Sequence, residues 1–158
     1  MKDIPDSERV YIDQMGIDEY IHREKARAVR GKRVKGCVSG KKYKRTNMIA
    51  AKRGKDILAP LEYKGTTDHI LVEWWLINML FPLLAAGCVI ILDSASFHRK
   101  KVLNALAEEY GFSIIFLPPY SPDYNPLEKY WAWMKSYLKK IMHNYSCLCF
   151  AIRACFEP

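Results

Sequence analysis

The chain has 158 residues, of which 50% are hydrophobic and 13% aromatic, and its formal net charge is +8. A chain of this length and apolar content buries a core, which excludes an intrinsically disordered protein. It contains no repeats, low-complexity tracts or linker, so we expect one domain spanning residues 1–158.

The first predicted elements are strands. "RVYID" (9–13) is β-branched and aromatic and ends on Asp13, which predicts a short strand. "KRVKGCVSG" (32–40) and "KRTNMIAAKR" (44–53) predict two more, joined by the turn Gly40-Lys41-Lys42. The three would form an initial meander.

Helices and strands then alternate. A helix capped by Thr66, Thr67 or Asp68 should run to about Leu80 and stop near Pro82. The apolar runs "CVIILD" (88–93) and "FSIIFL" (112–117) predict buried strands, separated by an amphipathic helix within 97–111. The apolar side of that helix consists of Val102, Leu103, Leu106 and Tyr110.

The last long helix begins at Asn125-Pro126, and a shorter one follows after Tyr145. The apolar face of the long helix consists of Leu127, Tyr130, Trp131, Met134 and Leu138. The element order β-β-β-α-β-α-β-α predicts an α/β fold in which a mixed five-stranded sheet carries helices on both faces.

Basic residues are concentrated in one segment. Residues 23–55 hold 14 of the 25 lysines and arginines, with Glu24 as the only acid. A solvated face is one interpretation, but missing counter-charges favour a surface that grips phosphates. The predicted DNA-binding residues are Arg30, Lys32, Arg33, Lys41, Lys42, Lys44, Arg45, Arg99 and Lys100.

Two other features bear on location. The five cysteines lack zinc-site spacing, so we expect free thiols in a reducing cytosol and a cytoplasmic protein. The apolar stretch 70–92 is long enough to cross a bilayer, but Glu73, Asn78, Pro82 and Gly87 interrupt it. We therefore predict no membrane span and no membrane partner.

Three acidic residues stand at the ends of predicted elements. Asp13 and Asp93 each end a predicted strand, where α/β sheets gather ligands, although such an aspartate can also be a plain strand terminator or helix cap. Glu128 falls at the third helical position after Asn125, where it can serve as a cap.

The segment "LPPYSPDYNPLEKYW" (117–131) favours a chemical role for Glu128. Capping does not explain Pro118, Pro119 and Pro122, which fix the path of the chain into the helix. A rigid approach is needed where carboxylates must meet around Mg²⁺, which tolerates little geometric error. We therefore predict that Asp13, Asp93 and Glu128 converge.

These motifs resemble those of a known family. "YIDQMG", "ILDSASFH" and "PPYSPDYNPLEKYW" are similar to the three acidic motifs of D-D-E transposases of the mariner-type superfamily, most closely its bacterial insertion-sequence branch. The second and third acids are separated by 34 residues, as in that branch. The resemblance runs from about Val10 to the end of the chain.

The resemblance implies a ribonuclease H-like fold and cut-and-paste DNA transposition. Asp13 would bridge two Mg²⁺ ions, replaceable by Mn²⁺, while Asp93 and Glu128 would each hold one. Water would cut DNA at the transposon end, and the freed 3′-hydroxyl would attack target DNA. His98 and Asn125 are peripheral to this site.

The resemblance also has implications for partners. It implies a homodimer acting on paired transposon ends. Family members carry an N-terminal helix-turn-helix portion, but only about a dozen residues precede Asp13. We expect this portion to be encoded separately, or the chain to be a truncated relic that binds DNA without sequence preference.

Two departures leave alternatives open. The family usually shows Asp-Glu in place of Asp13-Gln14 and Asp-Asn in place of Asp93-Ser94. A transposase-derived DNA-binding module without activity, or another ribonuclease H-like nuclease such as a resolvase or integrase core, would share the fold and the acids.

Overall fold

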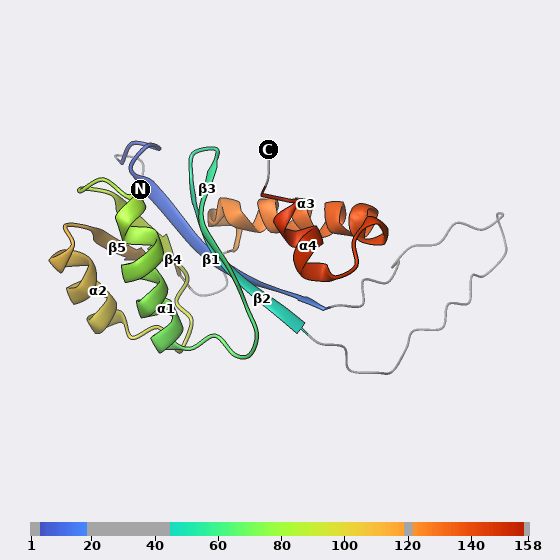
Figure 1. Cartoon of the computed structure of the whole chain (residues 1–158). Helices are drawn as coiled ribbons and strands as arrows, with labels where there is room; N and C mark the ends of the chain where they lie inside the picture. Colours follow the sequence, from blue (N-terminus) through green and yellow to red (C-terminus); the bar gives the residue numbers. More distant parts are fainter. Residues whose placement is uncertain (1–3, 19–44, 119–121, 157–158) are drawn as a thin grey trace, which may run out of the picture.

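The computed structural model describes residues 4–18, 45–118 and 122–156. Five strands form one sheet in the order β3-β2-β1-β4-β5 (Figure 1). They are β1 (Arg9–Asp18), β2 (Arg45–Arg53), β3 (Asp56–Tyr63), β4 (Val89–Leu92) and β5 (Ser113–Phe116). β1, β2 and β3 pair antiparallel, whereas β1–β4 and β4–β5 are parallel. The predicted mixed five-stranded sheet is confirmed.

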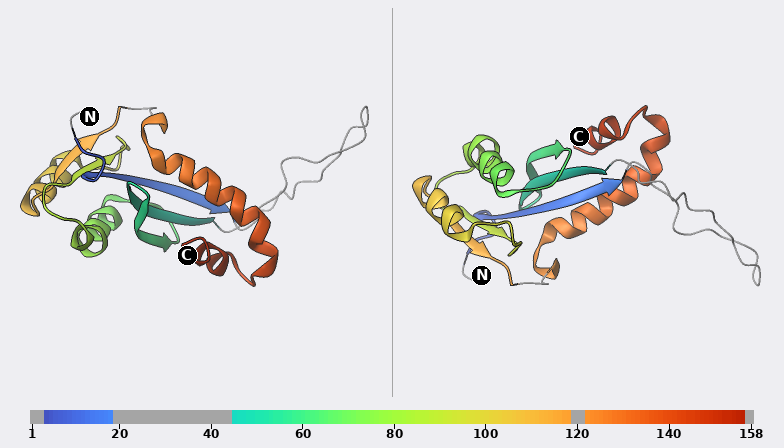
Figure 2. Two further views of the ribbon diagram at one scale, coloured as in Figure 1. Left: turned by 90° about the horizontal axis from the view of Figure 1, so that it is seen from above. Right: turned by 90° about the horizontal axis from the view of Figure 1, so that it is seen from below.

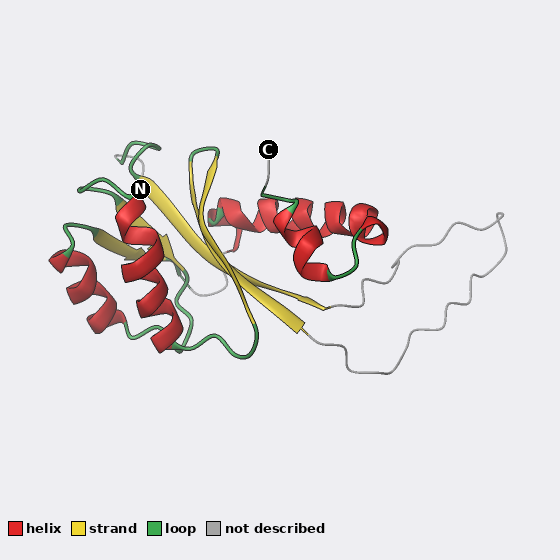
Figure 3. Ribbon diagram, viewed as in Figure 1, coloured by secondary structure: helices red, strands yellow, loops and turns green. Residues whose placement is uncertain are grey.

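Helices cover both faces of the sheet (Figures 2 and 3). They are α1 (His69–Trp75), continued by a π-helical turn (Leu76–Leu80) and a 3₁₀ turn (Phe81–Leu83), then α2 (Lys100–Glu109), α3 (Pro126–Ile141) and α4 (Leu148–Arg153). Asp68 caps α1 as predicted, because its carboxylate accepts a 2.8 Å hydrogen bond from the backbone N–H of Leu71. None of the described helices has the length and hydrophobicity that a bilayer crossing requires.

Each face of the sheet has its own core. Val10 and Ile12 of β1 pack with residues of α1 and α2. Met15 and Ile17 pack with residues of α3 and α4. Since neighbouring side chains along a strand point to opposite faces, Asp13 is directed to the α3 face.

The sequence prediction misplaced part of the meander. The described third strand is β3, which follows β2 after the two-residue turn Gly54-Lys55 and was not predicted. Gly54 adopts a φ of 56°, which suits glycine in such a turn. The predicted strand at 32–40 and its turn lie outside the described residues, and so does Cys37. The remaining four cysteines are free thiols.

Two further boundaries differ from prediction. β1 continues to Asp18 instead of ending at Asp13. In α2, Leu103 is buried as expected, but Val102 and Tyr110 are more than 40% exposed. The predicted start of α3 is confirmed, and so is its buried face, with Tyr130 only partly covered.

Candidate active site

Asp13 and Asp93 lie side by side on neighbouring strands. In the parallel pairing of β1 with β4, Tyr11 is opposite Ile91. Asp13 and Asp93 each follow two residues later, so both stand just beyond the paired residues of the two strands. Asp93 comes just after β4 has ended, whereas β1 continues along β2 alone. The aspartates therefore stand where the sheet opens.

Asp13 is largely buried and is held by two hydrogen bonds. Its Oδ1 accepts from the backbone N–H of Gln14 at 2.8 Å, and its Oδ2 accepts from Nε1 of Trp131 at 3.1 Å. Burial raises the pKa of Asp13 to about 7, and the negative charges of Glu128 and Asp93 act in the same direction. Glu128 and Asp93 thus both lie within electrostatic range of Asp13.

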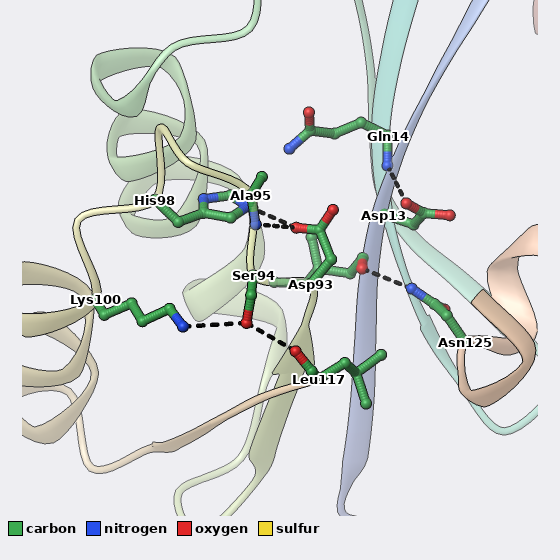
Figure 4. Close-up of polar contacts among 10 residues, drawn as sticks. Asp13, Gln14, Asp93, Ser94, Ala95, His98, Lys100, Leu117 and Asn125 are labelled. Atoms are coloured by element: carbon green, nitrogen blue, oxygen red, sulfur yellow. Dashed lines mark hydrogen bonds and ion pairs between the residues drawn. The ribbon is translucent and has the colours of Figure 1, made fainter. Parts of the chain in front are cut away.

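Asp93 has the opposite electrostatic environment. Nε2 of the buried His98 donates to its Oδ1 over 3.1 Å, and the backbone N–H of Ala95 donates to the same oxygen (Figure 4). The hydrogen bond from His98 lowers the pKa of Asp93. Of two neighbouring carboxylates, the structure keeps Asp93 ionised and favours protonation of Asp13.

Asn125 fixes α3 against the strand that carries Asp13. Its Oδ1 accepts from the backbone N–H of Leu127, which caps the helix, and its Nδ2 donates to the backbone carbonyl of Ile12 at 3.0 Å (Figure 4). Glu128 lies in the first turn of this helix. Asn125, predicted to be peripheral, therefore joins the start of the helix that carries Glu128 to the strand that carries Asp13.

Glu128 itself is exposed, and within the described part of the chain its carboxylate makes no hydrogen bond or ion pair. The structure therefore shows no hydrogen bond by which the Glu128 carboxylate would cap α3. Trp131, interpreted from sequence as core packing alone, is buried and also bonds Asp13. The sequence did contain a signal for this role of Trp131. Trp131 follows Glu128 by three residues, and residues three apart share one side of a helix.

A second set of contacts joins the ends of β4 and β5. The hydroxyl of Ser94 donates to the carbonyl of Leu117 over 2.7 Å and accepts from Nζ of Lys100 over 3.1 Å (Figure 4). The same ammonium lies 5.0 Å from the ring centre of Phe116. Ser94, the residue after Asp93, thus fixes the ammonium of Lys100 near the ends of β4 and β5.

In the described segments, no three His, Cys, Asp or Glu side chains stand together closely enough to form a metal site. The donor chemistry still suits a hard cation, because all three acids offer oxygen ligands. The raised pKa of Asp13 also reflects excess negative charge that a cation would relieve.

The family model described as "DDE superfamily endonuclease" matches residues 8–148. The chain belongs to this family. The match contains all three acids and every element from β1 to α3. No curated protein sequence matches the chain.

Solved structures agree with the fold of this DDE endonuclease domain. A Mos1 transposase paired-end complex with left transposon end has a TM-score of 0.71 at 18% identity, covering 84% of this chain and 42% of that one. A Mos1 mariner paired-end complex with Mn has a TM-score of 0.69 at 15% identity, covering 98% and 53%. A simian T-cell lymphotropic virus intasome, in complex with PP2A regulatory subunit B56 gamma, has a TM-score of 0.63 at 10% identity, covering 95% and 47%.

These likenesses confirm the predicted ribonuclease H-like fold. The DDE domain spans about half the length of the solved chains it matches. The predicted bacterial insertion-sequence branch stays a prediction.

The predicted DNA-binding residues fall into two groups. Arg45, Arg99 and Lys100 are described and exposed. The other members, Arg30, Lys32, Arg33, Lys41, Lys42 and Lys44, lie outside the described residues. Arg99 is engaged by Glu73 of α1, with contacts of 2.7 and 2.8 Å to its two carboxylate oxygens.

Single glutamine substitutions of Arg99 and Lys100 should have different effects. We expect Arg99→Gln to cost about 0.5 kcal/mol of unfolding free energy, because it removes a half-exposed ion pair. Lys100→Gln should weaken duplex DNA binding at least about threefold more than Arg99→Gln, because Lys100 carries no carboxylate partner in the described part of the chain whereas Arg99 is neutralised by Glu73. Urea denaturation and fluorescence anisotropy measure the two effects, and equal losses of affinity would contradict the assignment.

Proposed function

We propose that this DDE domain is a transposase catalytic domain that cuts DNA at transposon ends and joins the ends to target DNA. The observation that carries the proposal is that Asp13 and Asp93 each stand two residues beyond the paired Tyr11 and Ile91, and that the charges of Glu128 and Asp93 add to the effect of burial on the pKa of Asp13. This supports a common site formed by Asp13 of β1, Asp93 just after β4 and Glu128 of α3. The family match supports endonuclease chemistry of this kind.

Asp13, Asp93 and Glu128 would hold divalent metal ions, two Mg²⁺ or Mn²⁺ as expected from sequence. Bound ions of this kind stabilise the attacking and leaving oxygens of a phosphodiester. Support comes from the oxygen donor set and from solved Mos1 complexes with Mg and with Mn.

The remaining side chains would position these groups. Trp131 and the backbone of Gln14 orient Asp13, and His98 orients Asp93. Asn125 keeps the helix that carries Glu128 against β1. Lys100 would attract the DNA phosphate to the open edge of the sheet.

DNA, as transposon end and as target, is the proposed partner. The titles of the matching structures name a left transposon end and a strand transfer complex for Mos1. A homodimer and a separately encoded helix-turn-helix portion belong to the same proposal, as does action in the bacterial cytoplasm at the nucleoid.

Plasmid nicking tests the proposal. With Mg²⁺ or Mn²⁺ the chain should nick supercoiled DNA, and Asp93→Ala should reduce nicking at least about 100-fold because a metal-holding carboxylate is lost. Asp18→Ala is the matched control, since Asp18 is an exposed aspartate at the end of the same strand that carries Asp13.

The product pattern separates the alternatives. Joining of 3′-hydroxyl ends to a second DNA supports a transposase, whereas hydrolysis alone supports another ribonuclease H-like nuclease. DNA binding without metal-dependent nicking would instead support an inactive module, the reading that Gln14 and Ser94 favour.

A further inference from the structure

A stack of aromatic rings lies on the outer side of α3. Trp133 and Tyr137 are stacked, with ring centres 5.4 Å apart and planes within 7° of parallel. Tyr130 adds a third ring, 5.4 Å from Trp133. Trp133 is 49% exposed and Tyr137 is 37% exposed. We call Tyr130, Trp133 and Tyr137 the α3 ridge. None of the three takes part in the acidic site.

The charge around the α3 ridge is of one sign. Residues 129–140 contain four lysines and no acid. Lys129 precedes Trp133 by four residues and Lys140 follows it by seven, so both lie on the same side of the helix as the rings. This combination of flat rings and cations complements a polymer that carries bases and phosphates.

The α3 ridge begins close to the acids. Lys129 also lines a cavity of about 670 Å³ together with Tyr11, Lys52 and Tyr124. Tyr11 lies two residues before Asp13 on the same face of β1, a rise of about 6.6 Å. The cavity is also lined by Arg9 and by the acids Asp6 and Asp123, so its charge is mixed. A DNA strand on the ridge would continue past Lys129 and the rings of Tyr124 and Tyr11 toward Asp13.

We propose that the α3 ridge binds single-stranded DNA, with bases stacked on Trp133 and Tyr137 and phosphates held by Lys129 and Lys140. Bases inside a duplex are already stacked on one another and cannot cover these rings, whereas a frayed or cut strand can. The inference rests on the proposed function only in taking DNA as the polymer.

Binding of a fluorescent dT20 oligonucleotide to the full chain in EDTA tests the proposal without cleavage. Trp133→Ala should weaken binding about 5- to 100-fold, the range for losing one base-stacking residue. Trp74→Ala is the matched control, because Trp74 is also 49% exposed but lies on α1, on the opposite face of the sheet (Figure 2). It should change binding less than about twofold.

The salt dependence supplies a second readout. Lys129→Gln and Lys140→Gln should each reduce the slope of log affinity against log salt concentration by about 0.7. Circular dichroism and thermal melting establish that each variant is folded. Unchanged dT20 affinity in Trp133→Ala would overturn the proposal.

Another outcome would assign a different partner. If the wild type is a dimer and Trp133→Ala is a monomer in sedimentation, the ridge contacts a second copy and the proposal falls. The same titrations with variants that also carry Asp93→Ala test DNA binding by the ridge independently of the proposed endonuclease activity. Loss of dT20 binding on adding Trp133→Ala there supports the ridge, whatever the nicking assay shows.

Discussion

Asp13→Asn should abolish metal-dependent nicking and at the same time stabilise the metal-free protein at pH 8. Nicking should fall by about 1,000-fold or more, because Asp13 is the proposed central ligand and ligands that act as a unit cannot replace one another. Stability should rise because asparagine removes a buried negative charge that lies close to Glu128 and Asp93. A substitution that lowers activity but raises stability is typical of a functional site whose like charges repel one another until a ligand binds.

The pH dependence follows from the pKa of Asp13, about 7 in the folded chain and about 3.9 for an unfolded aspartate. Between these values the folded state holds the extra proton. Stability is therefore fully present below about pH 4 and is lost as the pH rises to about 7. At about 1.4 kcal/mol for each pH unit, the loss is on the order of 4 kcal/mol.

Asparagine keeps one oxygen where aspartate has two, so it can accept from Gln14 or from Trp131 but not from both. The lost hydrogen bond costs about 1 kcal/mol, which leaves a net gain of about 1–3 kcal/mol at pH 8. At pH 5 the gain should be close to zero, because only about 1.5 kcal/mol of the loss has then occurred and the lost hydrogen bond offsets most of it.

Urea denaturation in EDTA at pH 5 and pH 8 measures both values. Asp18→Asn at the exposed end of the same strand should change stability little at either pH. Mg²⁺ or Mn²⁺ should stabilise the wild type at pH 8 but not Asp13→Asn, because only the wild type keeps the proposed ligand. A less stable Asp13→Asn at pH 8 would contradict the electrostatic account.

The sequence patterns located the parts of the site that depend on local structure. The continuous apolar run before Asp93 and the Asn125-Pro126 start of α3 were visible because strand and cap signals are local. β3 was not predicted because it contains Pro60, and a proline argues against an interior strand. In addition, Ala59 adopts a φ of 48°, which is unusual for alanine and is not predictable from the sequence.

The position of Asp13 was only half predictable. The pattern "YID" placed it correctly on a strand, but Gly16 interrupts the apolar pattern and hid the continuation to Asp18. That continuation matters, since Asp13 then stands in mid-strand beside the end of β4. Contacts such as Trp131 to Asp13, 118 residues apart, arise only from tertiary packing and leave no local signal.

Asn125→Ala should destabilise the chain by about 2–4 kcal/mol and lower nicking at least about tenfold. Asn125 is 5% exposed, and the substitution removes the cap of α3 while leaving the carbonyl of Ile12 without its donor. A lost cap costs about 1 kcal/mol and a buried unpaired group about 1–3 kcal/mol. Activity should fall because α3, which carries the proposed ligand Glu128, loses its hydrogen bond to β1.

Asn125→Asp separates the two roles, because aspartate retains the oxygen that caps α3 but cannot donate to Ile12. If anchoring to β1 positions Glu128, Asn125→Asp should lose nicking as fully as Asn125→Ala, even in a buffer where both variants remain folded. Asn78→Ala is the control, since Asn78 is exposed and, among the described residues, its side chain bonds only the carbonyl of Trp74 in the same helical segment. It should cost less than about 0.5 kcal/mol. Full nicking by folded Asn125→Asp would show that the cap alone suffices, and that Glu128 reaches Asp13 without the contact between α3 and β1.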